Sequence, residues 1–232
     1  LFIYPHDRLG QWRQENVLLE LNPPSDQLAE QALEALRDGS AVYGLPLATK
    51  ALVLYGRQSS PALPADLSKA KPGPWIATST NSYYEAFPWL AAAGARPFDA
   101  KGRPALDSAE HERGLEQLKK LITQKQITRG LDAAQAKAAF LRGQVPYLLD
   151  GPWALTELQR HVNDLVVLPS PVVFGERTKP FATVEAIFAS VHSAHPKRAQ
   201  QVAQLLASNA SARRRAIDAG QLVPNTELQD EL

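Results

Sequence analysis

The sequence has no cysteine and no methionine among its 232 residues. Without cysteine, the chain can form no disulfide, no cysteine-ligated zinc site, no iron–sulfur cluster and no thiol nucleophile. A complete reading frame begins with methionine, and this chain begins instead in the apolar run 1–4. We therefore expect it to be a processed or excised piece of a longer protein.

An excess of charge of one sign is also missing. Lys and Arg number 25 and Asp and Glu number 24, which gives a formal net charge of +1. This balance provides no general attraction to nucleic acid or to acidic membranes, so we expect no nucleic-acid partner. No apolar run approaches the about 18 residues that a membrane-spanning helix requires.

Sequence motifs of catalysis and nucleotide binding are absent as well. The chain contains no G-x-S-x-G, G-x-x-x-x-G-K, G-x-G-x-x-G or H-E-x-x-H segment. His192 and His195 have the spacing of metal ligands, but Pro196 follows at a predicted helix start and no acidic residue is adjacent. No pair of carboxylates stands out as an acid/base couple. We therefore predict no enzyme, no catalytic residue, no metal site and no cofactor.

What the chain does contain is an alternation of short apolar runs and amphipathic segments. Ser25 is a good N-cap for a helix that Gly39 would end, and residues 56–74, with four prolines, predict a loop. Strands that alternate with helices indicate an α/β fold. Strands are expected at 1–4, 41–46, 51–55, 75–78, 145–149, 165–168 and 186–189, and helices at 25–39, 83–93, from 108, 132–143, from 151, 196–208 and 211–219.

Aromatic residues are few, but they gather at the predicted strand ends and helix starts, where α/β proteins bind ligands. Sugars stack on aromatic rings, and Asp and Arg bind their hydroxyls. Tyr4, Asp7 and Arg8 place a ring, a carboxylate and a guanidinium within one turn, although a structural Asp–Arg pair at a helix start fits equally well. The aromatic residues concerned are Tyr4, Trp12, Tyr83, Tyr84, Phe87, Trp89 and Trp153.

A series of segments, in order along the chain, is similar to one family. Residues 4–10, Y-P-H-D-R-L-G, resemble the W-A-H-D-R-x-G segment of maltose/maltodextrin-binding proteins, within the family 1 extracellular solute-binding proteins of ABC transporters. Residues 43–52 resemble the first strand that crosses between the lobes. The remaining matches are 84–94 with the helix start that stacks on sugar, 138–154 with the A-A-F…G…N-G-P-W-A stretch, and 179–181 with the second crossing.

The resemblance implies a type II periplasmic-binding-protein fold whose two lobes close on a sugar. By this alignment the first lobe comprises 1–48 and 184–232, and the second lobe 49–183. The first lobe is then incomplete, because its opening strands and the family's C-terminal helices are missing.

The resemblance also implies roles for single residues. Tyr4 takes the place of an aromatic sugar contact, Asp7 and Arg8 match partners of sugar hydroxyls, and Tyr84 and Trp153 match stacking residues. Tyr83 and Lys50 complete the predicted substrate-binding set, since Lys50 can donate to hydroxyls. Three positions depart from the maltose binders: Lys50 and Ser82 stand where those proteins carry Glu, and Ala133 stands where they carry a contacting Tyr.

Two functional hypotheses follow. The first is a periplasmic sugar-binding module of an ABC importer that binds maltose or maltodextrins and delivers them to the permease subunits. The second is a non-binding structural or docking domain, an extracytoplasmic part of a maltose-type transporter membrane subunit, which the departures and the missing segments favour. In both cases, contact with the inner membrane is expected only through the permease or a fused membrane segment.

Overall fold

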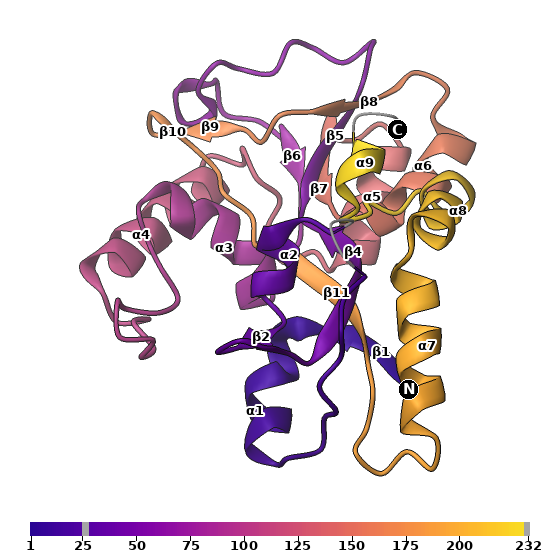
Figure 1. Cartoon of the computed structure of the whole chain (residues 1–232). Helices are drawn as coiled ribbons and strands as arrows, with labels where there is room; N and C mark the ends of the chain where they lie inside the picture. The colour runs from indigo at the N-terminus through magenta and orange to yellow at the C-terminus, as the bar shows by residue number, and fades with distance from the viewer. Residues whose placement is uncertain (25–27, 230–232) are drawn as a thin grey trace. The chain divides into compact units, whose positions relative to one another are not determined.

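The computed structural model describes residues 1–24 and 28–229, and its contacts divide the chain into two compact units (Figure 1). Unit 1 comprises Leu1–Lys50 and Ala182–Leu232, and unit 2 comprises Ala51–Phe181. The predicted lobes, 1–48 with 184–232 and 49–183, are close to these units in extent, and their role as lobes stays a prediction. Ser25, the predicted helix cap, lies outside the described residues.

Unit 1 is built on a three-stranded antiparallel sheet in the order β1-β11-β4. β1 is Phe2–Pro5, β11 is Thr183–Phe188 and β4 is Gly44–Lys50. Successive side chains of a strand point to opposite faces. Accordingly, Val184, Ala186 and Phe188 of β11 pack into one hydrophobic cluster, and Ile187 packs into another. The central strand is therefore covered on both faces.

Helices cover the two faces of this sheet. α7, Pro196–Ala207, labelled in Figure 1, packs against β4. Three alanines at every fourth residue of α7 are buried in this contact: Ala199, Ala203 and Ala207. Small side chains at this spacing allow a helix to approach the sheet closely. The other elements of unit 1 are η1 His6–Arg8, α1 Leu9–Gln14, α2 Glu30–Glu34, β2 Arg37–Asp38, β3 Ala41–Val42, α8 Asn209–Ala219 and α9 Thr226–Gln229.

The helix predicted over 25–39 is wrong at both ends within the described residues, because Leu28 forms a bridge with Asn225 and α2 begins only at Glu30. α2 ends at Glu34, and the chain then forms the two-stranded hairpin of β2 and β3 around Gly39. Gly39 has a φ of +62°, a conformation that glycine adopts without steric cost. Asp38 pairs with Ala41, so Gly39 and Ser40 form the two-residue loop, and glycine at its first position turns a hairpin where we expected it to end a helix.

Unit 2 contains a mixed four-stranded sheet in the order β6-β7-β5-β8. β5 runs antiparallel to both of its neighbours, whereas β6 and β7 are parallel. The four strands are β5 Val53–Arg57, β6 Ile76–Ala77, β7 Tyr147–Asp150 and β8 Leu165–Leu168.

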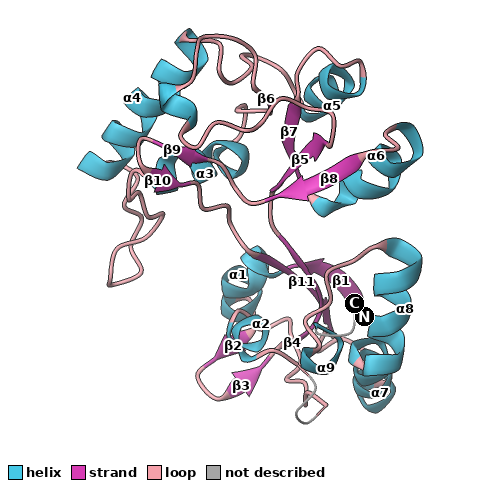
Figure 2. Cartoon of the chain, turned by 90° about the horizontal axis from the view of Figure 1, so that it is seen from above, coloured by secondary structure: helices cyan, strands magenta, loops and turns pink. Residues whose placement is uncertain are grey.

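Three helices of unit 2 begin at residues that stabilise a helix N-terminus. Ser82 and Glu85 form a capping box at α3, and Asp132 and Gln135 form one at α5. Ser108 caps α4, as predicted. α3 and α4 pack side by side (Figure 2). The elements of this unit are η2 Leu67–Lys69, α3 Tyr83–Ala92, α4 Ala109–Thr123, α5 Ala133–Leu141, η3 Pro152–Ala154, α6 Leu155–His161, β9 Val172–Val173 and β10 Glu176–Arg177.

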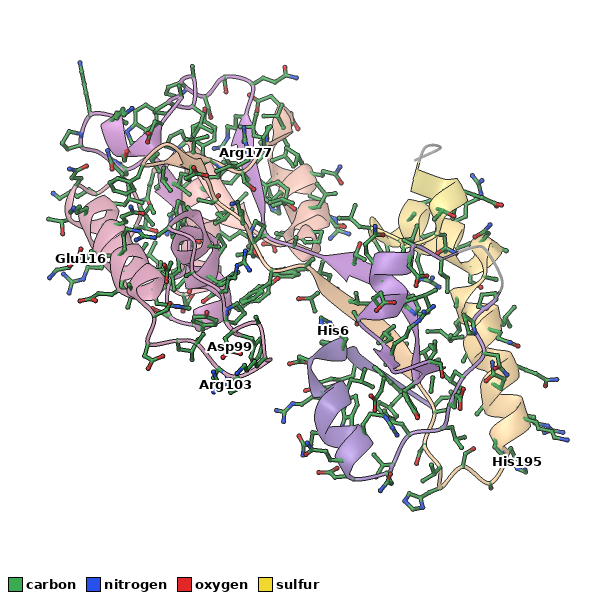
Figure 3. All side chains as sticks on the ribbon, turned by 60° about the vertical axis from the view of Figure 1, so that its left-hand side comes forward. His6, Asp99, Arg103, Glu116, Arg177 and His195 are labelled. Carbon is green, nitrogen blue, oxygen red and sulfur yellow. The ribbon has the colours of Figure 1, made fainter. Side chains whose placement is uncertain are left out.

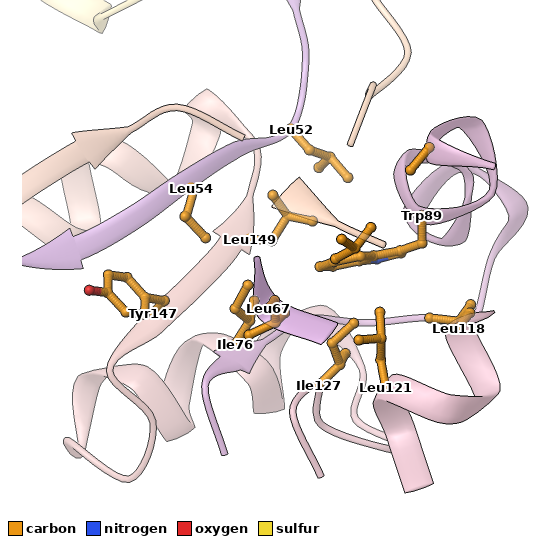
Figure 4. Close-up of a cluster of buried hydrophobic side chains, with 12 residues drawn as sticks. Leu52, Leu54, Leu67, Ile76, Trp89, Leu118, Leu121, Ile127, Tyr147 and Leu149 are labelled. Atoms are coloured by element: carbon orange, nitrogen blue, oxygen red, sulfur yellow. The ribbon is translucent and has the colours of Figure 1, made fainter. Parts of the chain in front are cut away.

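The core of unit 2 lies on both faces of its sheet. On one face, the indole of Trp89 is fully buried in a cluster that includes Leu121 of α4 and Leu149 of β7 (Figure 4). On the other face, Phe140 of α5 packs with Leu148 of β7. Since both faces are covered, β7 is fixed along its whole length, and the position of its last residue, Asp150, is fixed with it.

Candidate functional site

The parallel strands β6 and β7 end at the same edge of the sheet in unit 2. Thr78 and Ser79 follow β6, and Asp150 is the last residue of β7. Ligands of α/β proteins bind beyond the carboxyl ends of such strands. At this edge the structure contains a small pocket of about 50 Å³. Its lining residues are Leu52, Thr78, Ser79, Tyr84, Glu85, Ala133, Ala136, Leu149, Asp150 and Trp153.

Two aromatic side chains line this pocket. Trp153 lies in η3, directly after β7, and 55% of its surface is exposed. Tyr84 lies in the first turn of α3 and is half-buried, with its ring stacked on Phe181 at a centroid distance of 6.1 Å and an interplanar angle of 16°. Tyr84 and Trp153, two residues predicted from the resemblance, thus line one pocket.

Two carboxylates line the same pocket, and both were missed by sequence reasoning. Asp150 is only 7% exposed. Its carboxylate accepts the Gly151 backbone N–H at 2.7 Å and lies in the same pocket lining as the Trp153 side chain. Burial raises the pKa of Asp150 above its usual value, and the nearby Glu85 carboxylate adds to this. The hydrogen bond from Gly151 and the positive charge of Lys137 act in the opposite direction.

Glu85 is held by the start of α3. Its Oε2 accepts hydrogen bonds from the Ser79 hydroxyl at 2.6 Å, the Ser82 hydroxyl at 3.0 Å and the Ser82 backbone N–H at 3.2 Å. The Glu85 side chain therefore links the end of β6 to the N-terminus of α3. The capping box Ser82-x-x-Glu85 is visible in the sequence, and so is a carboxylate that ends an apolar strand before Gly-Pro-Trp. These signals could have found both acids.

Tyr83, although next to Tyr84, is not among the described residues that line this pocket. Its hydroxyl lies 2.9 Å from His111 Nε2, and its ring packs on His111, Phe87 and Phe181. Burial raises the pKa of the Tyr83 phenol. These contacts fasten α3 to α4 and to the segment that leaves unit 2 at Phe181.

The other predicted contacts belong to unit 1. Tyr4 is 43% exposed and packs edge-on against Trp12 at 5.4 Å. Asp7 and Arg8 are exposed in η1, and Arg8 Nη1 donates to Gln11 Oε1 at 3.1 Å. No ion pair joins Asp7 to Arg8 among the residues that the structure describes, so the alternative of a structural Asp–Arg pair is not observed.

Two further residues of unit 1 fix these segments to β11. His6 Nδ1 accepts the Val184 backbone N–H at 3.1 Å, which attaches η1 to this strand (Figure 3 labels His6). Lys50, the last residue of β4, forms an ion pair with Glu185 of β11. The Lys50 ammonium therefore already has a carboxylate partner within unit 1.

The described residues contain no group of three or more His, Cys, Asp or Glu side chains that could hold a metal ion. Within residues 1–24 and 28–229, no helix has the length and apolar character needed to cross a membrane.

A mixed α/β fold with aromatic rings and hydrogen-bonding acids around one pocket is typical of proteins that bind a solute. Two comparisons with known proteins give the same class. The family model described as bacterial extracellular solute-binding protein matches residues 1–231. The chain is also similar to a solved structure entitled "Crystal structure of cyclo/maltodextrin-binding protein complexed with maltotetraose", with 26% sequence identity and a TM-score of 0.85.

The similarity covers 98% of this chain and 65% of that one, so the chain spans about two thirds of the length of the protein it matches. The fold is that of type II periplasmic-binding proteins, and the class is a solute-binding protein, not an enzyme. The chain belongs to the bacterial extracellular solute-binding protein family.

Proposed function

We propose that this chain binds malto-oligosaccharides in the periplasm as the sugar-binding part of an ABC importer, and that it delivers them to the permease subunits. The observation that carries the proposal is the pocket of unit 2, which combines the rings of Tyr84 and Trp153 with the carboxylates of Asp150 and Glu85.

The chemistry of this pocket suits a sugar. A pyranose ring offers apolar C–H faces that pack on aromatic rings and hydroxyls that donate to carboxylates. Thr78 and Ser79, which follow β6, add further hydrogen-bonding groups. The pocket is small, so we propose that it holds part of one sugar ring and that the exposed indole of Trp153 stacks on that ring or on the next one.

The known proteins support the sugar class. The similar solved structure was determined with maltotetraose bound, and the family binds solutes outside the cytoplasm. The proposal includes the two units as lobes and Tyr4, Asp7 and Arg8 as sugar contacts supplied by unit 1. Lys50, paired with Glu185, is the weakest member of the predicted set.

The test is isothermal titration calorimetry with maltose, maltotriose and longer maltodextrins, with the β-linked cellotriose as a comparison sugar. We expect saturable binding of the α-linked sugars, and we expect Trp153→Ala and Tyr84→Ala each to weaken it by about tenfold or more. Phe98→Ala is the matched control, because Phe98 is a comparably exposed aromatic of unit 2, 57% against 55%, and lies outside the pocket.

Two results would contradict the proposal. One is the absence of heat with every α-linked sugar from a protein whose circular dichroism and cooperative unfolding show that it is folded. This result would favour the second hypothesis, in which the chain is a non-binding structural or docking domain. The other is a loss of affinity in Phe98→Ala equal to that in Trp153→Ala, which would mean that the pocket of unit 2 is not the place where the sugar binds.

A further inference from the structure

We infer that Asp150 and Gly151 are positioning residues that hold the indole of Trp153 as a preformed stacking face of the unit 2 pocket. The inference rests on the proposed sugar-binding function and deepens it, because it identifies what orients the exposed ring. Two observations carry it, one for each residue.

The first observation is how closely the indole approaches Gly151. A Cβ atom added to Gly151 would lie 2.2 Å from Trp153 Cη2 and 2.3 Å from its Cζ2 and Cζ3. Carbon atoms that are not bonded stay about 3.5–4.0 Å apart at their best separation. The six-membered ring of the indole thus occupies the space that any side chain at position 151 would take. Glycine is required here to make room for the ring.

The backbone of Gly151 does not itself require glycine. Its φ of −84° and ψ of 171° lie in the extended region that all residues adopt, which is also the region preferred before a proline. Alanine at this position would therefore leave the backbone unstrained. Because Trp153 is exposed, its ring could move away into solvent, so the substitution displaces the ring and leaves the fold intact.

The second observation is that the buried carboxylate of Asp150 and the Trp153 side chain lie together in the lining of one pocket, so that the carboxylate can accept the indole N–H. The indole Nε1–H is the only hydrogen-bond donor of that side chain. The same carboxylate accepts the Gly151 N–H at 2.7 Å, and the Tyr55 hydroxyl donates to the Gly151 carbonyl at 3.0 Å. The surface on which the indole rests is therefore fixed from both sides to the sheet.

This arrangement matters for binding because a ring that is already oriented loses little conformational freedom when a sugar stacks on it. Pro152, whose ring fixes φ, further restricts the path from Gly151 to Trp153. An exposed tryptophan without these restraints would sample several rotamers, and a sugar would have to select one of them.

The ionisation state of Asp150 affects how strongly its carboxyl group holds the indole. The groups near its carboxylate are Lys137 of α5, Glu85 of α3 and the phenol of Tyr55 in β5. A carboxylate accepts a hydrogen bond more strongly than a carboxylic acid does. Burial raises the pKa of Asp150, so the indole should lose its charged acceptor at a higher pH than an ordinary Asp would allow.

The first arm of the test measures maltotriose affinity in Gly151→Ala and in Gly10→Ala. Gly10 is the matched control, since a Cβ there meets nothing within 4 Å and its backbone is helical. We expect G151A to lose about three- to tenfold in affinity, the range of an aromatic contact, with an unchanged unfolding midpoint, and G10A to bind like the natural sequence. An unchanged affinity in G151A overturns the inference and leaves the proposed function standing.

The second arm needs no sugar, so it separates the two claims if maltotriose does not bind at all. The indole N–H resonance of Trp153 is followed by ¹⁵N NMR and assigned with Trp153→Phe. We expect the resonance to move with pH as Asp150 titrates, to shift in G151A and Asp150→Leu, and to stop titrating in Asp150→Asn, which keeps an oxygen acceptor. A resonance that is independent of pH and unchanged in D150L overturns the inference.

Discussion

Asp66 offers a prediction whose size follows from the structure. Its carboxylate is 10% exposed and joins two segments of unit 2 that are more than 100 residues apart. Oδ1 accepts the backbone N–H groups of Ser68 at 3.0 Å and Phe174 at 3.1 Å, and Oδ2 accepts the N–H of Gly175 at 2.9 Å. The Ser68 hydroxyl also donates to Oδ1, at 2.6 Å. Asp66 thereby attaches η2 to the turn between β9 and β10.

Asp66→Ala removes this acceptor from three backbone amides. A hydrogen bond to a charged group contributes about 1.5–3 kcal/mol, and an amide left without a partner loses about 1–3 kcal/mol where it is buried. Water can reach part of this turn, so we expect a decrease of about 2–4 kcal/mol in the free energy of unfolding. With a urea m value near 3 kcal/mol/M, the midpoint should fall by about 1 M.

Asp99 provides the control, because its carboxylate also accepts several hydrogen bonds but only within one exposed loop. It binds the backbone N–H groups of Lys101 and Arg103 at 2.8 and 2.9 Å and the Arg103 guanidinium at 2.8 Å (Figure 3). These partners are two and four residues away, so Asp99→Ala should change the urea midpoint little. Equal midpoints for Asp66→Ala and the natural sequence would refute the reasoning.

The pH dependence of the Asp66 effect has a definite sign. Burial alone would raise the pKa of Asp66, but hydrogen bonds from Ser68, Gly175 and Phe174 outweigh it and lower the pKa below the usual 3.8. The stabilisation is therefore fully present above pH 3.8 and is lost as the pH falls through the lower pKa of the folded state. The difference between Asp66→Ala and the natural sequence should shrink on acidification in the same urea assay.

Three further predictions concern stability. The raised pKa of Asp150 means that the folded state binds the proton more tightly, so stability should fall as the pH rises from 3.8 through the folded pKa, and Asp150→Asn should flatten this slope in urea titrations at several pH values. Gly114→Ala places a Cβ 2.9 Å from the Leu90 Cα, so thermal unfolding should show a loss of about 1–2 kcal/mol despite the better helix propensity of alanine. The Lys50 and Glu185 side chains are 30% and 25% exposed, so water still screens their ion pair, and a double-mutant cycle should give a coupling energy of under about 1 kcal/mol; a larger value would contradict this screening.

Local signals predicted many elements correctly because the physics behind them is local. Ser108 and Asp132 cap their helices because their side chains accept a free N–H group of the first turn. Pro196 begins α7 because proline has no N–H that would need a partner there. The run 165–168 is confirmed as a strand. The error at Gly39 arose because the same residue can end a helix or turn a hairpin, and contacts with the rest of unit 1 decide between these outcomes.

The candidate site was likewise only partly predictable from the sequence. The ordered motifs identified the family, and the resemblance selected Tyr84 and Trp153, which line one pocket. Asp150 and Glu85 could not be paired from the sequence, because one ends β7 and the other begins α3, 65 residues earlier. Only the sheet edge brings these two carboxylates to one pocket.

The amino-acid sequence by itself determined the α/β class, the starts of α3, α4, α5 and α7, and the family, since each depends on residues close together along the chain. The tertiary structure decided that Lys50 pairs with Glu185 and that the Tyr83 hydroxyl bonds to His111. These contacts depend on strand order and on the close packing of side chains from separate elements, which no local pattern encodes.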